Sequence, residues 1–343
     1  MIDYNGLILT NVTSIVSFKL FLFIILALLI SFAVDMMFGE LPAKIHPVVI
    51  MGSIINFFKN IFIKIKNKAS GLMVVVFVFA VISIILYLIY LISSFNVILL
   101  FVIFTILLSS TYSVKMLLQT AVDVKNDLNE SIDKARKSVS YLVSRNTDEL
   151  TESFIVSAVI ESLTENITDS YIAPVFYFFI FAMIILINPI NNCLYYLLLI
   201  PIIYRASNTM DAMLGYKTKE LRDIGFVPAK LDDILNYIPA RISGLFVVIS
   251  AYLLNLDGKN SFKIMMRDAR KCPSPNSGYT MAPTAGALNI QLIKKDTYIL
   301  GDDNKVIIAD DISKAVKLSK LTIILFTIIM IILFTLVYVI LWK

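Results

Sequence analysis

Long uncharged stretches alternate with polar segments along the chain, and their lengths decide how many helices can cross a membrane. A hydrocarbon core about 30 Å thick needs roughly 20 helical residues. Residues 15–38 are predicted to form one crossing helix and residues 321–342 another. The 46 uncharged residues between Lys68 and Lys115 suit two passes that turn near 93–96.

Two further stretches are shorter. The 35 uncharged residues between Asp169 and Arg205 suit two short or tilted passes that turn at 188–192. Residues 242–256 are only 15 in number, below the usual crossing length of roughly 17–25, so we expect them to be re-entrant, interfacial or buried in the helix bundle. The pattern predicts an all-α polytopic membrane protein with about six transmembrane helices, one short helix of this kind and cytoplasmic helical segments.

The basic residues favour one orientation in the membrane. With six crossings, four segments fall on one side: 39–68, 115–169, 205–241 and 257–319. Of the 30 Lys and Arg residues, only Lys19 and Lys343 lie outside these segments and their borders. Short connections rich in Lys and Arg stay in the cytoplasm, so we expect these segments to be cytoplasmic and both termini to lie outside.

Composition narrows the class of protein. Apolar residues make up 58% of the 343-residue chain and charged ones 16%, and the mean hydropathy is +0.84, which excludes a disordered, fibrous or ordinary cytosolic protein. Cys193 and Cys272 are too isolated for a disulfide framework or a zinc site. The net charge of +5 fits anionic lipid or anionic substrates. Without repeats or linkers, residues 1–343 are predicted to form one membrane-embedded domain.

An amphipathic pattern opens the second cytoplasmic segment. The apolar positions Leu128, Ile132, Ala135 and Val139 recur every three or four residues, which indicates one helix over about 121–143 that packs against the bundle.

Three carboxylates follow at helical spacing and suggest a metal site. Glu161, Glu165 and Asp169 would stack on one helix face, where like charges destabilise the helix unless something neutralises them. Mg²⁺, which binds through one or two carboxylates plus substrate phosphates, is a suitable partner. The alternative is a solvated acidic face.

Two more polar groups border the membrane. Arg205, Asn208 and Asp211 can share a broad helix face, although Arg205 could also be a simple topology anchor. Asp232 and Asp233 precede the short apolar stretch, where charge near lipid depth points to function or, alternatively, to an acidic first turn stabilised by the helix dipole.

Other candidates lie at about residues 267–276 and 35–46. Arg267 and Arg270 precede a turn that contains Ser274 and Asn276, a composition that suits phosphate binding or an ordinary turn. Asp35 lies near the end of the first predicted span. His46 is the only histidine of the chain, and a structural role competes with a catalytic one.

These motifs, taken together and in order, resemble the CobD/CbiB family of cobalamin biosynthesis over about residues 30–290. The resemblance rests on Asp35 with Gly39-Glu40, His46-Pro47-Val48, Glu161-Ser162-Leu163 with Glu165-Asn166 and Asp169, Ala173-Pro174, Arg205 with Asn208-Thr209 and Asp211, Gly215-Tyr216, Leu231-Asp232-Asp233 with Asn236-Tyr237-Ile238-Pro239-Ala240-Arg241, Arg267-Asp268-Ala269-Arg270, Pro273-Ser274-Pro275-Asn276-Ser277-Gly278, and Ala285-Gly286-Ala287-Leu288. Residues 289–319 match less clearly, and we assign them no role.

The resemblance implies an adenosylcobinamide-phosphate synthase at the cell membrane. Such a ligase uses ATP and Mg²⁺ to join a carboxylate of adenosylcobyric acid to the amine of (R)-1-amino-2-propanol phosphate, or of a related amino alcohol. The lipid bilayer, and other membrane-associated enzymes of the pathway, are the expected partners, and no nucleic acid is expected.

For this reaction we expect three groups of site residues. The metal ligands would be Glu161, Glu165 and Asp169, with Asp232 and Asp233 as the competing set. Phosphate and substrate would bind to Arg205, Asn208, Arg241, Arg267, Arg270, Ser274 and Asn276. The candidates for the catalytic base are Asp211 and His46, with Asp35 as a further catalytic candidate.

Two other functions compete with the ligase. A CDP-alcohol-type membrane phosphotransferase also gathers Asp residues and an Ala-Arg pair such as Ala240-Arg241, but the Asp-Gly pair that begins its motif is missing. A transporter would place charges along a pathway through the membrane. Here the charges gather on one predicted face and the predicted span centres are bare, which favours catalysis at the surface.

Overall fold

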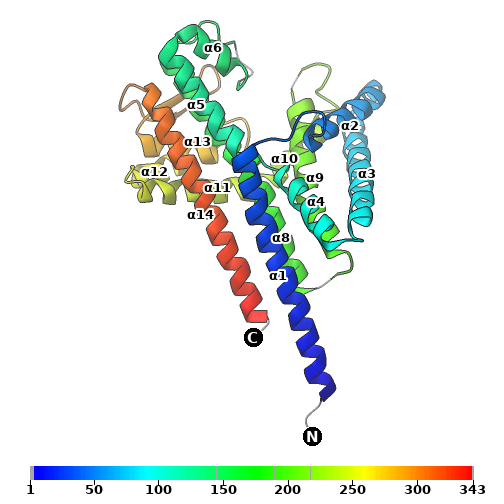
Figure 1. Cartoon of the computed structure of the whole chain (residues 1–343). Helices are drawn as coiled ribbons and strands as arrows, with labels where there is room; N and C mark the ends of the chain where they lie inside the picture. The colour runs from blue at the N-terminus through cyan, green and yellow to red at the C-terminus, as the bar shows by residue number, and fades with distance from the viewer. Residues whose placement is uncertain (1–3, 144–145, 189, 217, 342–343) are drawn as a thin grey trace. The chain divides into compact units, whose positions relative to one another are not determined.

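The computed structural model describes residues 4–143, 146–188, 190–216 and 218–341 and is almost entirely helical (Figure 1). The chain divides into two compact units, which we call the first and the second unit. The first unit consists of Met1–Tyr112, Pro174–Phe226 and Ile328–Lys343. The second consists of Ser113–Ala173 and Val227–Thr327. Each unit is therefore assembled from segments that lie far apart in the sequence.

Helices of the first unit follow the uncharged stretches, and polar residues start them. Asn67 and Asn96 accept hydrogen bonds from backbone N–H groups of the turns that follow, as helix N-caps do. His46 caps a third helix through Nδ1, 3.1 Å from the Val48 nitrogen. The helices are α1 (Tyr4–Phe38), α2 (Pro47–Phe62), the short η1 (Ile63–Ile65), α3 (Lys68–Ser93), α4 (Val97–Ser109), α8 (Ala173–Ile187) and α9 (Cys193–Leu214).

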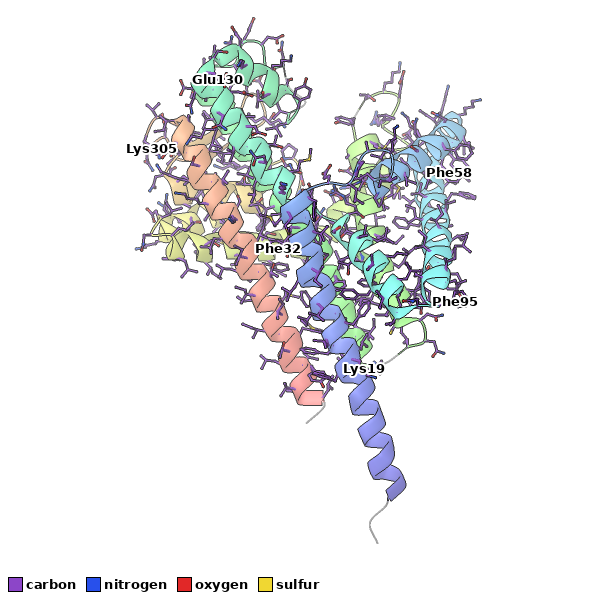
Figure 2. The ribbon with its side chains drawn as sticks, viewed as in Figure 1. Lys19, Phe32, Phe58, Phe95, Glu130 and Lys305 are labelled. Carbon is purple, nitrogen blue, oxygen red and sulfur yellow. The ribbon has the colours of Figure 1, made fainter. Side chains whose placement is uncertain are left out.

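Aromatic rings pack the helices of the first unit together. Phe58 of α2 stacks on Phe77 of α3 with 5.4 Å between ring centroids, and Tyr87 of α3 meets Tyr195 of α9 edge-on at 5.2 Å. Figure 2 shows Phe58 on α2 and Phe95 at the turn that follows α3. Phe95 is 91% exposed, which suits an aromatic side chain at a membrane interface.

The second unit contains the remaining helices and the two described strands. Its elements are α5 (Val114–Glu130), α6 (Ile132–Ser140), α7 (Glu152–Ile167), the π-helical turn η2 (Thr168–Ile172), α10 (Phe226–Leu235), α11 (Tyr237–Leu253), α12 (Gly258–Asp268), the 3₁₀ turn η3 (Ala269–Lys271), α13 (Gly278–Leu288), β1 (Gln291–Lys294), β2 (Tyr298–Gly301) and α14 (Ala309–Leu341). The last helix passes from the second unit into the first after Thr327.

Close packing in the second unit depends on two glycines of α13. A Cβ at Gly278 would lie 2.0 Å from the Ala269 carbonyl oxygen, and one at Gly286 would lie 2.7 Å from the Asn260 carbonyl oxygen. These absent side chains allow α13 to approach η3 and α12. The chain then forms an antiparallel hairpin, β1–β2, in which Leu292 pairs with Leu300.

The predicted all-α membrane architecture is confirmed. Within the described residues, six segments are long and apolar enough to cross a membrane: Ser17–Phe38, Pro47–Ile65, Lys68–Ser93, Val97–Glu130, Glu152–Ile187 and Ala309–Leu341. The predicted turns near 93–96 and 188–192 both separate helices, although positions 189 and 342 of the predicted segments lie outside the described residues.

This set of spans differs from the prediction at two helices, α2 and α9. Pro47–Ile65, which the sequence pattern placed in a cytoplasmic segment, meets the length and hydropathy required for a span. Helix α9, which forms the predicted pass before Arg205, does not, because its C-terminal half is polar. The short stretch at 242–256 lies in α11, which is bent by 45° from α10, as in a broken span or a re-entrant loop.

One predicted helix is wrong in its continuity. The expected helix over 121–143 is broken at Ser131, which ends α5 and whose hydroxyl oxygen then caps α6 by accepting a hydrogen bond from the Lys134 nitrogen at 3.2 Å. The first helix also begins earlier than predicted, at Tyr4.

Candidate functional site

Glu161 is the most firmly held of the predicted metal ligands. It lies on α7 with 4% of its surface exposed. The Ser157 hydroxyl, one turn earlier, donates to Oε1 at 2.7 Å, and the Tyr298 hydroxyl of β2 donates to Oε2 at 2.9 Å. Ser157 in turn accepts from the Ile293 nitrogen of β1 at 3.0 Å. The hairpin therefore fixes the orientation of this carboxylate.

Burial also decides the protonation of two groups beside Glu161. Burial raises the pKa of the Tyr298 hydroxyl, and the Glu161 carboxylate adds to the rise, so the tyrosine remains a neutral donor. Burial likewise raises the pKa of the Cys272 thiol to about 11, with Ser277 opposing and the carboxylates of Glu165 and Glu161 contributing. The thiol at the start of the loop before α13 therefore lies within electrostatic reach of the α7 carboxylates.

The other two carboxylates of the predicted stack differ from Glu161. Glu165 is exposed and lies near Lys294 of β1, whereas Asp169 lies in the π-helical turn η2. No three acidic, histidine or cysteine side chains among the described residues converge as metal ligands. Glu161 and Glu165 lie within electrostatic reach of each other, and a Mg²⁺ ion bound through one or two carboxylates would take its remaining ligands from nucleotide phosphates and water.

The competing acidic pair lies at the end of α10. Asp232 is buried and its Oδ2 accepts from the Asn236 side-chain amide at 3.0 Å. Asp233 is only partly buried and forms an ion pair with Lys230 at 3.1 Å. Their different partners separate two neighbours that the sequence pattern treated alike.

Arg241 of α11 is enclosed by aromatic rings. Its guanidinium carbon lies 3.4 Å from the ring centroid of Tyr237 and 4.2 Å from that of Tyr279. The guanidinium also donates to the carbonyl oxygen of Tyr237 at 2.5 Å, to Oδ1 of Asn276 at 3.2 Å and to the carbonyl oxygen of Pro275 at 3.4 Å. These contacts fix a cation at the junction of α10 and α11.

The turn between η3 and α13 connects these groups. Asn276 is buried, accepts from Arg241 and donates to the Asp233 carbonyl oxygen at 2.8 Å. The Ser274 hydroxyl oxygen accepts from the Asn276 nitrogen at 3.2 Å. Asn276 thus holds the turn against α10 and α11, whereas the hydrogen bond of Ser274 stabilises the turn itself.

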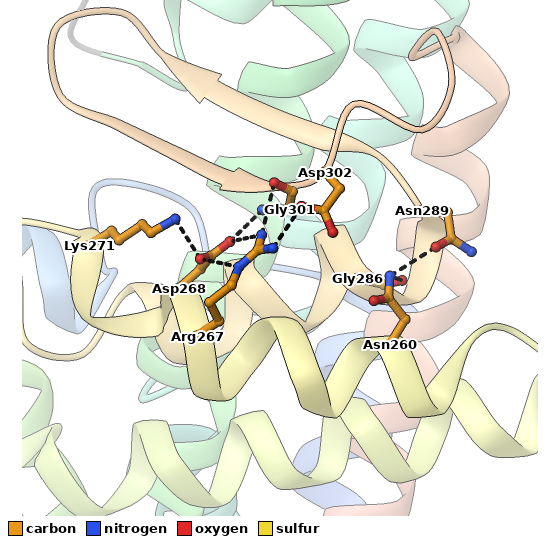
Figure 3. A network of polar contacts seen from close by, with 8 residues as sticks. All are labelled: Asn260, Arg267, Asp268, Lys271, Gly286, Asn289, Gly301 and Asp302. Carbon is orange, nitrogen blue, oxygen red and sulfur yellow. Dashed lines mark hydrogen bonds and ion pairs between the residues drawn. The ribbon is translucent and has the colours of Figure 1, made fainter.

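The two arginines before the turn have different surroundings. Arg267 binds Asp268 through two hydrogen bonds of 2.8 Å and Asp302 through one of 2.7 Å (Figure 3). Asp268 is fully buried and also receives Lys271 at 2.6 Å and the Gly301 nitrogen at 2.9 Å. Arg270 is exposed and is hydrogen-bonded to the Tyr279 side chain.

These donors explain the acidity of Asp268. Burial alone would raise its pKa, but the hydrogen bonds from Arg267 and Lys271 outweigh that effect and hold the pKa at about 2. Arg267 is correspondingly neutralised, so its guanidinium is committed to the protein in this structure.

The remaining candidates lie in the first unit. Asp35 is buried on α1, and His46 is buried at the start of α2. Burial lowers the pKa of His46; the neighbouring Glu40 carboxylate opposes this effect and Arg205 adds to it. A neutral imidazole has one nitrogen lone pair, and Nδ1 uses it to cap α2, so His46 can accept a proton only when that cap is released.

Helix α9 supplies the other three residues of the first unit. Arg205 donates to Oδ1 of Asn208 at 3.3 Å, and its buried Nε has no hydrogen-bond partner among the described residues. Asp211 lies one turn from the helix end, and a Cβ at Gly215 would come within 2.1 Å of its Oδ1. The absence of a side chain at Gly215 therefore avoids a steric clash with the Asp211 carboxylate.

The structure adds residues that the sequence motifs did not single out. Ser157 and Tyr298 contact Glu161, and Tyr237 and Tyr279 contact Arg241. Lys294 lies within electrostatic reach of Glu165. The spacing of Ser157, four residues before Glu161 on a helix, was the one available signal for that contact.

Comparisons with known proteins confirm the resemblance. The model of the family described as CobD/Cbib protein matches residues 28–340. A probable cobalamin biosynthesis protein CobD of Methanothermobacter thermautotrophicus is 45% identical over 304 residues, which are 88% of this chain and 95% of the relative. Relatives with the same name are 41% identical in Methanococcus aeolicus, over 80% of this chain and 86% of theirs, and 37% identical in Methanocaldococcus jannaschii, over 89% and 96%. No solved structure matches the chain.

Proposed function

Because the chain belongs to the CobD/CbiB family of cobalamin biosynthesis proteins, we propose that it is the amide-forming ligase of that pathway. In this proposal it joins a carboxylate of adenosylcobyric acid to the amine of (R)-1-amino-2-propanol phosphate and uses ATP. The product is adenosylcobinamide phosphate. The family match over residues 28–340 carries the proposal. The second unit also contains both acidic side chains and arginines without a carboxylate partner among the described residues, which supports it.

The reaction needs an activated carboxylate. In the proposed course a carboxylate oxygen of adenosylcobyric acid attacks the terminal phosphorus of ATP, and ADP leaves. The amine of the second substrate then attacks the acyl carbon, the amide bond forms, phosphate leaves, and the nitrogen gives up its proton. Mg²⁺, when bound with the nucleotide, offsets phosphate charge during the transfer.

The chain's own side chains divide these tasks. Glu161 and Glu165 are the proposed carboxylates for the cation, and Asp169, Asp232 and Asp233 remain candidates of the same kind. Arg241 and Arg270 are the proposed phosphate-binding residues, because guanidinium groups match phosphate oxygens. In the first unit, Arg205 is a further candidate for anion binding. His46 and Asp211 are the proposed acceptors of the amine proton.

A product assay tests the proposal directly. Purified protein in detergent, with lipid restored, is incubated with adenosylcobyric acid, aminopropanol phosphate and MgATP, and the amide is sought by mass spectrometry. We expect product from the parent chain and loss of product in Glu165→Gln and Asp232→Asn, with both variants folded. Asp303→Asn is the control, because Asp303 is exposed and lies outside these clusters.

Other outcomes would replace the proposal. If folded protein makes no amide with the phosphorylated amino alcohol and none with the free one, the proposed ligase activity is wrong. Release of CMP from a CDP-alcohol would indicate a phosphotransferase instead, and uptake of a corrinoid into proteoliposomes without chemical turnover would indicate a transporter.

We also propose that the site faces the cytoplasm and that the two termini lie outside. The distribution of Lys and Arg supports this orientation. Single cysteines in place of Lys230 and Lys295, both outside the candidate spans, in a cysteine-free background, should react with a membrane-impermeant maleimide only in inverted vesicles. Labelling of Lys230→Cys in sealed cells would indicate the opposite orientation.

A further inference from the structure

Three arginines of the second unit were candidates for phosphate binding, and the structure separates them by charge. Arg267 is neutralised by Asp268 and Asp302. Arg241 and Arg270, in contrast, form no ion pair with a carboxylate among the described residues. Two unneutralised guanidinium groups remain, which repel each other unless an anion binds between them.

A single tyrosine contacts both of these cations. The face of the Tyr279 ring lies 4.2 Å from the Arg241 guanidinium carbon, and the Tyr279 side chain is hydrogen-bonded to Arg270. The Tyr237 ring centroid also lies close to the Arg241 guanidinium carbon, at 3.4 Å, and Tyr237 is within electrostatic reach of Arg270. The two guanidinium groups are therefore held within a few side-chain widths of each other.

Arg241 keeps donors available for a ligand. A guanidinium carries five N–H groups, and three are used in the described contacts with Tyr237, Asn276 and Pro275. All three acceptors are uncharged, so they orient the group and leave its charge uncompensated. The aromatic rings restrict the guanidinium to one plane, which reduces the entropy lost when an anion binds.

We propose that Tyr279 is a positioning residue that holds Arg241 and Arg270 as a two-guanidinium clamp for a phosphate group. The inference rests on the proposed function. The clamp binds either the phosphate monoester of the amino alcohol or the terminal phosphate of the nucleotide, because both are terminal phosphate groups that carry about two negative charges. Arg267 plays no part in it and serves to hold the hairpin to α12.

Two substitutions of one residue test the clamp in graded steps. Tyr279→Phe removes the hydroxyl that holds Arg270 and keeps the ring over Arg241, whereas Tyr279→Leu removes both contacts. We expect the KM of the phosphate-bearing substrate to rise by roughly three- to tenfold in Tyr279→Phe and by more than about tenfold in Tyr279→Leu. The control is Tyr252→Phe, an exposed tyrosine on the same helix as Arg241.

The choice of substrate identifies the source of the phosphate. If the clamp holds the amino alcohol, the KM of aminopropanol phosphate rises while those of free aminopropanol and ATP do not. If it holds the nucleotide, only the KM of ATP rises. A merely structural role for Tyr279 would change kcat and the unfolding temperature and would affect all three substrates alike, and that result overturns the proposal.

Direct binding separates failure of the clamp from failure of the ligase. Equilibrium dialysis with radiolabelled ATP and with aminopropanol phosphate requires no turnover. Weaker binding of one of these in Tyr279→Leu supports the clamp even if no amide is made, and unchanged binding of both overturns it even if the amide is made. Arg241→Gln and Arg270→Gln should each weaken binding of the same ligand, and Arg267→Gln should not.

Discussion

Asp268 offers the sharpest test of how the second unit is held together. Its side chain is fully buried and accepts hydrogen bonds from Arg267, Lys271 and the Gly301 nitrogen. The change Asp268→Asn keeps the size of the side chain and removes its charge. The side chains of Arg267 and Lys271 are 40% and 49% exposed, so both cations can turn to water, and the loss should fall below that of a fully enclosed ion pair.

The pKa of Asp268 gives the size of the effect. A carboxyl group whose pKa falls from 3.8 to about 2 on folding contributes about 2 kcal/mol to stability, at roughly 1.4 kcal/mol per unit. Since the folded pKa is the lower one, this contribution is complete above pH 3.8 and is lost as the pH falls towards 2. At neutral pH, Asp268→Asn should therefore unfold at a temperature lower by roughly 4–8 °C for a unit of this size.

Thermal unfolding in detergent between about pH 3 and 7 measures both quantities. The parent chain and Asp268→Asn should differ most at neutral pH and converge as the pH falls below about 4. Asp303→Asn, at an exposed position in the loop after β2, is the matched control and should unfold like the parent. Equal unfolding temperatures for Asp268→Asn and the parent at pH 7 would show that the Asp268 charge does not stabilise the fold. Arg267 would then again be a candidate for substrate binding.

Three further predictions follow from contacts in the structure. Gly278→Ala should destabilise the protein by more than about 2 kcal/mol, because its Cβ would meet the Ala269 carbonyl oxygen. Gly52→Ala, whose Cβ would have its nearest neighbour 3.6 Å away, should be neutral or slightly stabilising. Equal unfolding temperatures for the two variants would contradict this. Tyr298→Phe should cost about 1–2 kcal/mol, since it removes a hydrogen-bond donor from the buried Glu161, and an unfolding temperature equal to the parent's would contradict this. In Cys193→Ser protein, maleimide labelling of Cys272 should be slow at pH 7 and accelerate as the pH approaches about 11, because the reactive thiolate forms only there; rapid labelling of folded protein at pH 7 would count against the burial of this thiol.

The paired membrane helices were predictable because their signal is local. Between Lys68 and Lys115 the uncharged length and the capping residue Asn96 together specify two helices and a turn. Helix α2 was assigned to a polar segment because Lys59 and Lys64 lie near its end, although the residues between Pro47 and Phe58 are uncharged. The break at Ser131 was missed because the apolar spacing continues across it, while the capping signal of serine was overlooked.

The site residues were recognisable by type, but their partners were not. Glu161 and Arg241 belong to motifs that the sequence displays, yet Tyr298 reaches Glu161 from 137 positions away and Asn276 reaches Arg241 from 35. Such contacts depend on how α7, α11 and α13 pack, which no spacing along the chain encodes. The pairing of Arg267 with the adjacent Asp268 was visible in the sequence and argues against the clamp role predicted for Arg267.

The hairpin β1–β2 has the weakest sequence signal in the second unit, yet it completes two buried carboxylates. Tyr298 donates to Glu161 of α7, and the Gly301 nitrogen donates to Asp268 of α12. A buried carboxylate with too few donors is costly, so the hairpin adds to the donors that Ser157 supplies to Glu161 and that Arg267 and Lys271 supply to Asp268. The Gly301 donor is a main-chain N–H, which any residue at that position except proline would supply, so this contact leaves no side-chain signal in the sequence.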